Sequence, residues 1–342
     1  MGANLTGKQR VLNALQGKEV DRVPVLCVNQ TATYEQMEKL QVFWPEANYK
    51  AEQMANLAFG AASVLGFDAV RVPFCQTIEA EALGCTVKDG GKEGLPSIRD
   101  HLYKIGEPPV MPDDFLQRGR IQELIKAVKI LKELAGDNIF VIGGIIGPFS
   151  IAASLIGVTE ILKSSYRKAD TLEPYLEIGE RAGTLLAKEL IKAGADAICI
   201  EDMMASLDMI SPKIYREVVA PWEKKQIDQI NSLPLISHIC GKLDAVMDDI
   251  AAMGVAGISV EPKVNAVEAL AKLKQYNHPI ALIGGVDAVQ TLFSGTAEAV
   301  KAATIKAIEE GYAMIAPGCS IPPATPLERL KAMVEGSIAC QK

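Results

Sequence analysis

The stretch KAGADAICIE (192–201) decides the fold class, because its pattern returns in AMGVAGISVE (252–261) and EEGYAMIAPG (309–318). Each copy passes from the end of a predicted helix through a glycine into a short apolar run. Such a run, without polar alternation, is typical of a parallel strand that is buried on both faces. The repeat therefore predicts the strand–helix units of an α/β fold.

Apolar runs of this kind occur eight times along the chain, with helical segments between them. Eight parallel strands that alternate with helices predict a (β/α)8 TIM barrel, and a doubly wound sheet is the alternative. A capping box at residues 6–9 predicts one further helix, an N-terminal extension ahead of the first strand. The expected strands are Val23–Val28, Ala69–Phe74, Phe140–Ile146, Ala197–Asp202, Leu233–Cys240, Gly257–Pro262, Pro279–Val286 and Tyr312–Gly318.

The whole chain, residues 1–342, is expected to form a single barrel domain, because barrels of this length commonly do so. Residues 76–112 are polar, rich in glycine and too long for a plain strand–helix connection. We therefore expect this segment to form an excursion over the barrel mouth. The mouth is also where chemistry is expected, since barrel active sites lie at the carboxyl ends of the strands.

Charge and composition disfavour several classes of protein. Lys and Arg number 35 against 42 Asp and Glu, a net charge of −7, so we expect no nucleic-acid partner. The seven cysteines lack regular spacing and the opening MGANLTGKQR lacks the apolar core of a signal peptide, so a cytoplasmic location is expected. Residues 139–158 carry no charge, but their glycines and Pro148 favour a buried strand followed by a loop over a membrane span.

A candidate metal site lies at the end of the fifth expected strand, which reads SHICG (237–241). Residues two apart in a strand point the same way, so His238 and Cys240 are expected to face one space. Cys319 follows the eighth strand and can converge on them over the mouth. One imidazole and two thiolates suit a catalytic Zn²⁺ with an open fourth position, whereas Mg²⁺ and Ca²⁺ prefer oxygen. The alternative is that both cysteines are small buried core residues.

These ligands favour one kind of chemistry. Two anionic thiolates offset the charge of the metal and make it a poor activator of water, but zinc still removes the proton of a bound thiol. The residues alone therefore suggest alkylation of a thiol. Glu261, at the end of the sixth strand, is the catalytic candidate, as an exchangeable fourth ligand or as a group that orients a ligand. A mouth carboxylate paired with Lys or Arg explains it equally well. Asp202 is a further candidate as a partner of a ligand.

At these residues the chain resembles a known family. SHICG (237–241), APGCSIPPATPLE (316–328) and KEVDRVPVLCVNQTATYEQM (18–37) are similar to the methylcobalamin:coenzyme M methyltransferases of methanogens, members of the uroporphyrinogen decarboxylase superfamily. FGAASVLGFDAVRVPF (59–74) and GADAICIEDMMAS (194–206) extend the resemblance over essentially the whole chain. The resemblance implies a uroporphyrinogen-decarboxylase-like barrel.

The resemblance also implies a function. It implies that His238, Cys240 and Cys319 hold Zn²⁺, which binds coenzyme M (2-mercaptoethanesulfonate) as its thiolate, with Glu261 as the acidic residue beside the metal. The methyl group would come from methylcob(III)alamin carried on a small corrinoid protein, giving methyl-coenzyme M and cob(I)alamin. Neither a nucleic acid nor a membrane is implied as a partner. The original methyl donor, whether methanol, a methylamine or a methylthiol, is set by a different protein and stays open.

Four residues are candidates for contacts with the substrate. Arg71 lies within the second strand and is a candidate counter-ion for the sulfonate, because a buried cation needs a partner or a wet pocket. Gly285 lies at the end of the seventh expected strand, near where barrels often bind anions, although a tight turn explains the glycine equally well. Asn29 and Gln30 are candidates in the loop after the first strand. That loop, residues 29–34, holds no cation, which disfavours a porphyrinogen with many carboxylates.

Two alternatives to the coenzyme M reaction stay open. A related zinc barrel could methylate another thiol such as homocysteine, which would require a carboxylate–ammonium pair in the pocket. In the second alternative, the barrel has no catalytic activity and only docks a corrinoid protein. The intact set of three metal-ligand candidates argues against this second alternative.

Overall fold

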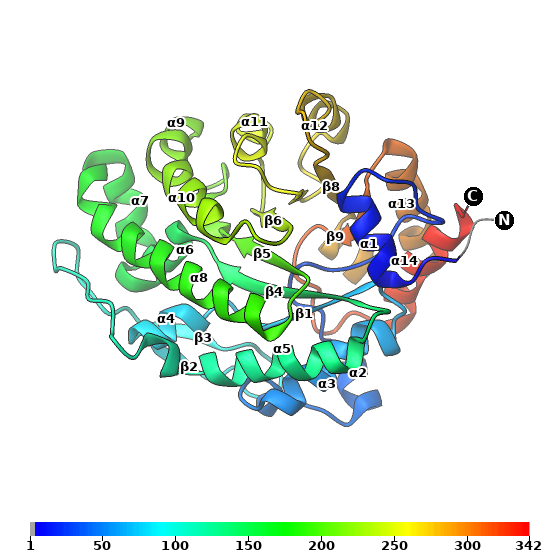
Figure 1. Cartoon of the computed structure of the whole chain (residues 1–342), viewed down its shortest axis with the longest axis horizontal. Helices are drawn as coiled ribbons and strands as arrows, with labels where there is room; N and C mark the ends of the chain where they lie inside the picture. The colour runs from blue at the N-terminus through cyan, green and yellow to red at the C-terminus, as the bar shows by residue number, and fades with distance from the viewer. Residues whose placement is uncertain (1–3, 342) are drawn as a thin grey trace.

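The computed structural model describes residues 4–341, and its centre is a parallel sheet of seven strands surrounded by helices (Figure 1). The strands follow one another in chain order around the sheet, as a (β/α)8 barrel requires. They are β1 (Ala69–Val72), β4 (Phe140–Ile146), β5 (Ala197–Glu201), β6 (Leu235–His238), β7 (Gly257–Ser259), β8 (Ala281–Val286) and β9 (Met314–Pro317).

The eighth position of the barrel is filled by the segment around Val25. Val25 forms a single parallel bridge with Ile315 of β9. On the other side its carbonyl accepts a hydrogen bond of 2.8 Å from the amide of Asp68, just ahead of β1. The expectation of a full strand over Val23–Val28 is therefore wrong in extent. Pro24 lacks an N–H and cannot donate to a ladder, which shortens the pairing.

Helix α1 (Gly7–Leu15) closes the amino-terminal end of the barrel. Thr6 caps it in the expected capping box, with Gln9 as the reciprocal partner. Its buried residues Val11 and Leu15 belong to the same core cluster as the first inward-facing strand side chains, among them Phe140. Since this end is plugged by apolar residues, only the carboxyl ends of the strands are available for a site.

The remaining helices cover the outside of the sheet or form the connections between strands (Figure 1). The longest helices are amphipathic, with buried positions recurring at three- and four-residue steps. The α-helices are α2 (Tyr34–Leu40), α3 (Ala51–Ser63), α4 (Ile78–Leu83), α5 (Ile121–Ala135), α6 (Pro148–Ile156), α7 (Val158–Arg167), α8 (Glu173–Ala193), α9 (Pro212–Ile214), α10 (Ala220–Ile230), α11 (Met247–Ala251), α12 (Ala266–Leu273), α13 (Ala297–Glu310) and α14 (Leu327–Ala339). Short 3₁₀ or π segments are η1 (Glu46–Asn48), η2 (Phe115–Gln117), η3 (Ala169–Leu172), η4 (Met203–Ala205), η5 (Tyr215–Val219) and η6 (Ala288–Phe293).

The long segment 76–112 has secondary structure of its own. After α4 it forms an antiparallel hairpin of β2 (Thr86–Lys88) and β3 (Ser97–Asp100), which is separate from the barrel sheet. The amides of Leu102 and Tyr103 both donate to the carbonyl of Leu155, at distances of 2.9 and 3.0 Å. These bonds attach the end of the hairpin to α6, beside the carboxyl ends of the strands.

Residues 139–158 depart from the sequence expectation in one respect. The buried strand is present as β4, but a helix, α6, follows it instead of a loop. Pro148 occupies the first turn of this helix, where its missing N–H costs nothing. Within residues 4–341 no helix is both long and apolar enough to cross a membrane.

Candidate metal centre at the barrel mouth

His238, Cys240 and Cys319 come together at the carboxyl ends of β6 and β9, as expected from the sequence. Cys240 Sγ lies 3.3 Å from His238 Nε2 and 3.3 Å from Cys319 Sγ. The three candidate ligand atoms all lie within 4.8 Å of one another. A nitrogen and two sulfurs at this spacing fit the donor set of a Zn²⁺ ion, with one position left for a substrate.

The orientation of the imidazole is set by Ser259, a residue that the sequence analysis did not single out. Ser259 pairs with His238 across β6 and β7, and its Oγ lies 3.0 Å from His238 Nδ1. Both residues are fully buried. The contact directs Nε2 toward the two sulfurs, the arrangement that a hydrogen-bonded metal-ligating histidine adopts. The sequence feature that could have identified Ser259 is its place two residues before Glu261, on the expected strand that follows the strand of His238.

The two thiols have opposite pKa shifts because they share a hydrogen bond. The bond with Cys240 and the neighbouring His238 lower the pKa of Cys319 to about 4, against the opposing effect of burial. The bond with Cys319, together with burial and the nearby Glu261 carboxylate, raises the pKa of Cys240 well above its ordinary value. The pair therefore carries negative charge on one sulfur, which favours binding of a cation.

Glu261 lies beside this cluster but not within it. Its carboxylate contributes to the pKa shift of Cys240, yet the compact group of ligand atoms does not include it. Glu261 Oε2 is 3.6 Å from Lys263 Nζ, and that ammonium is 3.0 Å from Asp208 Oδ2. The sequence analysis missed Lys263 and Asp208, because they lie 55 residues apart in two different loops.

The charge of Arg71, in β1, is compensated inside the barrel. Arg71 and Glu201 form an ion pair, and the side chain of each is only 1% exposed. Asn29 Nδ2 and Gln76 Nε2 also donate to Glu201 Oε2, at distances of 3.0 and 2.6 Å. Gly144 leaves room for the guanidinium, since a Cβ added there would lie 2.1 Å from Arg71. The structure thus brings Arg71 and Asn29 together, but around a carboxylate of the protein itself.

Three other candidates lie in different surroundings. Gln30 donates to the carbonyls of Ala32 and Ile321, at distances of 2.9 and 2.8 Å, and so holds two loops together. Gly285 lines a separate groove beside α12 and α13. Asp202 accepts hydrogen bonds from the amides at the start of α6 and from the Ser150 hydroxyl, so it caps that helix.

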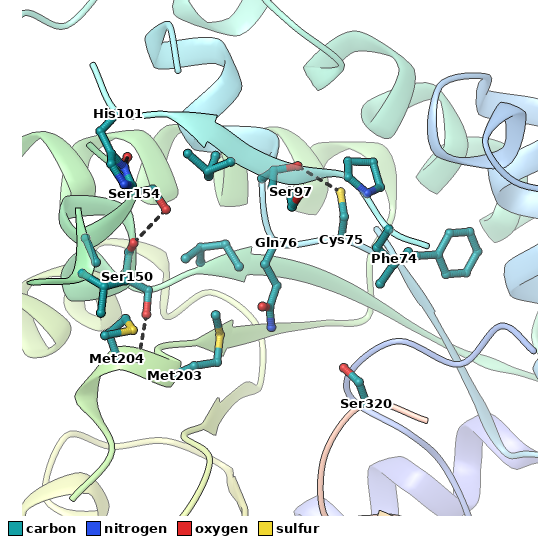
Figure 2. Close-up of a pocket in the computed structure, with 17 residues that line it drawn as sticks. Phe74, Cys75, Gln76, Ser97, His101, Ser150, Ser154, Met203, Met204 and Ser320 are labelled. Atoms are coloured by element: carbon teal, nitrogen blue, oxygen red, sulfur yellow. Dashed lines mark hydrogen bonds between the residues drawn. The ribbon is translucent and has the colours of Figure 1, made fainter. Parts of the chain in front are cut away.

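A cavity of about 460 Å³ opens at the mouth, and Ser320, the neighbour of Cys319, is among the residues that line it (Figure 2). In Figure 2, Gln76 and Cys75 lie on one side of it, Met203 and Met204 on another, and Ser320, the neighbour of Cys319, borders it. The remaining wall comes from residues 95–98 of the hairpin and from α6. Most of the lining is apolar, which is typical of a binding cavity for an organic group.

Comparison with known proteins assigns the chain to a family. A model of the family described as Uroporphyrinogen decarboxylase (URO-D) matches residues 6–337. The chain is 39% identical to the methylcobamide:CoM methyltransferase MtaA of Methanosarcina barkeri, over 97% of each chain. It is 37% identical to MtbA of Methanosarcina mazei, named a methylcobamide:CoM methyltransferase, over 96% of this chain and 97% of that one.

The solved structures agree with this assignment. A methyltransferase from Methanosarcina mazei superimposes with a TM-score of 0.93 at 37% identity, covering 98% of this chain and 99% of that one. The chain therefore belongs to the uroporphyrinogen decarboxylase (URO-D) family, and within it to the group of the methylcobamide:CoM methyltransferases.

Proposed function

We propose that this protein transfers a methyl group from a methylated corrinoid to the thiol of coenzyme M, in a reaction that depends on zinc. The observation that carries the proposal is the His238–Cys240–Cys319 cluster at the mouth of a barrel whose relatives are named for this activity. The products would be methyl-coenzyme M and cob(I)alamin. A cytoplasmic location and a corrinoid protein as the methyl donor belong to the same proposal.

The donor set supports zinc as the metal. His238 Nε2 and the two sulfurs lie close enough together for a single ion to contact all three. Zinc held there would act as a Lewis acid that keeps a bound thiol in its nucleophilic, deprotonated form. The residues of the chain orient this chemistry. Ser259 holds the imidazole, and Cys319, hydrogen-bonded to Cys240, supplies negative charge.

The substrate contacts predicted from the sequence need revision in one respect. Arg71 is paired with Glu201 inside the barrel, so its charge is already compensated. Asn29 and Gln76 also donate hydrogen bonds to Glu201. The four side chains therefore form one hydrogen-bond network, which favours a fixed arrangement of these groups. We propose that Arg71 positions Glu201 and the ends of β1 and β5 instead of binding the sulfonate directly.

The methyl donor needs access to the cluster from outside. The apolar cavity lined by Ser320 supports this route, because a corrin seated there would lie next to the segment that carries Cys319. Holding the two reactants in line replaces a costly bimolecular encounter and accounts for much of the rate in such a transfer. We propose that the hairpin of β2 and β3, with residues 95–98 on the cavity wall, forms part of the rim on which the corrinoid protein docks.

A direct assay tests the proposal. Enzyme, zinc and methylcobalamin are mixed with coenzyme M or with homocysteine, and the loss of the methylcobalamin absorbance is followed. We expect demethylation with coenzyme M and little with homocysteine. The reverse preference would assign the protein to the homocysteine alternative. No reaction with either thiol, from free or protein-bound methylcorrinoid, would leave only a docking role.

A further inference from the structure

Lys263 lies between two carboxylates at the edge of the metal centre. Its Nζ is 3.0 Å from Asp208 Oδ2 and 3.6 Å from Glu261 Oε2. Asp208 belongs to the turn after η4, whereas Glu261 and Lys263 follow β7. The exposed fractions of the side chains are 53% for Lys263, 35% for Asp208 and 21% for Glu261. The lysine is therefore reached from solvent, while Glu261 faces inward.

Two glycines bring these carboxylates against the metal-ligand candidates. A Cβ added to Gly318, the neighbour of Cys319, would lie 3.1 Å from the Cα of Glu261. A Cβ added to Gly241, the neighbour of Cys240, would lie 2.5 Å from Asp208 Oδ2. Gly241 also has a positive φ of 79°, a conformation that side chains disfavour. The backbone next to each cysteine is thus shaped to admit Glu261 and Asp208 at close range.

A metal ion with three protein ligands has one position for either a carboxylate or a substrate thiol. The Glu261 carboxylate lies beside Cys240 but outside the compact group of ligand atoms, so it would compete with the thiol for that position only by moving toward the metal. A carboxylate held off the metal in this partly buried place needs a counter-charge, since burying an unpaired anion is costly. Lys263 already supplies one, and Asp208, which is 3.0 Å from the same ammonium, anchors it.

We propose that Lys263, anchored by Asp208, is a positioning residue that holds the Glu261 carboxylate away from the metal while the thiol substrate is bound. The inference rests on the proposed function and extends it to a lysine–carboxylate latch. The half-exposed lysine limits the size of the effect, because exposed ion pairs contribute little. We therefore expect loss of the latch to weaken coenzyme M binding by about two- to fivefold.

The test compares coenzyme M binding to zinc-loaded variants by calorimetry. Lys263→Met should bind coenzyme M about two- to fivefold more weakly than wild type. At a matched coenzyme M concentration, X-ray absorption at the zinc edge should show a larger share of oxygen ligand in Lys263→Met. Lys263→Arg, which keeps the cation, should restore both readouts. Lys242→Met is the control, because Lys242 is exposed, close to the same loop and forms no ion pair within residues 4–341.

A double-mutant cycle separates the latch from direct binding of the substrate. In a Glu261→Gln background there is no carboxylate to hold, so adding Lys263→Met should change coenzyme M binding no further. A persistent loss in that background would mean that the lysine contacts the sulfonate itself, and would overturn the proposal. The proposal would also be overturned if Lys263→Met bound coenzyme M as tightly as the wild type, or if Lys242→Met lost as much affinity as Lys263→Met. Absence of zinc or of coenzyme M binding in the wild type would instead contradict the proposed function.

Discussion

The sulfur atoms of Cys240 and Cys319 lie 3.3 Å apart although 79 residues separate them in the chain. Their strands, β6 and β9, are separated in the sheet by β7 and β8. The two sulfurs therefore meet across the mouth and not along a shared ladder. Only a closed barrel brings the ends of strands that are not neighbours to one point. The candidate metal centre is thus a consequence of barrel closure, which the short bridge at Val25 completes.

Replacing one cysteine of the centre should remove zinc while leaving the fold intact. We expect about one zinc per wild-type chain and far less in Cys240→Ser or Cys319→Ser, with methyl transfer lost in parallel. The thermal midpoint should change little, because the barrel core is built from apolar residues elsewhere. Elemental analysis and thermal melting measure the two quantities. Cys340→Ser, near the end of α14, is the control that should keep its zinc. A steep fall of the melting temperature would make the metal structural.

Binding of coenzyme M to the zinc-loaded protein should release close to one proton at neutral pH. A free aliphatic thiol is mostly protonated there, since an unperturbed cysteine thiol has a pKa of about 8.5, whereas a metal-bound thiol is deprotonated. Calorimetry in buffers of different ionisation enthalpy gives the number of protons. Binding without proton release would contradict deprotonation of the thiol by the metal.

Breaking the Arg71–Glu201 pair should destabilise the protein strongly. Glu201→Gln leaves a guanidinium buried without its counter-charge, and we expect the free energy of unfolding to fall by about 3–5 kcal/mol. Arg71→Met with Glu201→Leu should cost less than the sum of the single changes, because no buried charge then remains unpaired. Asp100→Asn, which breaks an exposed pair with Arg99, should cost under about 1 kcal/mol. Chemical denaturation measures all of these, and additive losses would show that the pair is not coupled.

The buried acid Glu223 should make stability fall as the pH rises. Burial, with the nearby Asp202 charge, raises the pKa of Glu223 to about 8. Between the ordinary glutamate pKa and pH 8 the folded protein therefore holds a proton that the unfolded chain has released, and stability declines with pH in this window. Glu223→Gln keeps an acceptor for the Tyr215 hydroxyl, 2.6 Å away in wild type, and should flatten the decline by about 1–3 kcal/mol. Unfolding at pH 5 and pH 8 checks this, and parallel curves for both proteins would contradict it.

The role of the hairpin as a docking rim can be tested by adding charge to it. Ile98→Glu places a carboxylate on the cavity wall and should slow reaction with a methylated corrinoid protein more than reaction with free methylcobalamin. Thr86→Glu adds the same charge at an exposed position of β2 that does not line the cavity, and serves as the control. Equal slowing with both donors would place the effect at the metal centre instead of the rim.

Much of the fold followed from local patterns. Apolar runs predict buried strands, and residues two apart in a run share a face, so the barrel and the pairing of His238 with Cys240 were predictable from the sequence. The length of each strand was less predictable from the sequence. Pro24 and Pro73 shorten the pairing of the first two expected strands, and the stretch 139–158 ends in a helix because Pro148 begins one.

By itself, the sequence determined the barrel, the helix ahead of its first strand and the three metal-ligand candidates, since each depends on a local pattern: an apolar run, a capping box, or a His or Cys at the end of such a run. Only the tertiary structure decided which charges neutralise one another. Arg71 pairs with Glu201 from 130 residues away, and Lys263 with Asp208 from 55 residues away. A cation in a sequence has many possible partners, and the choice depends on distances of a few ångströms between loops. Those distances exist only after the strands have closed into a barrel, because Coulomb attraction and hydrogen bonding act over that short range.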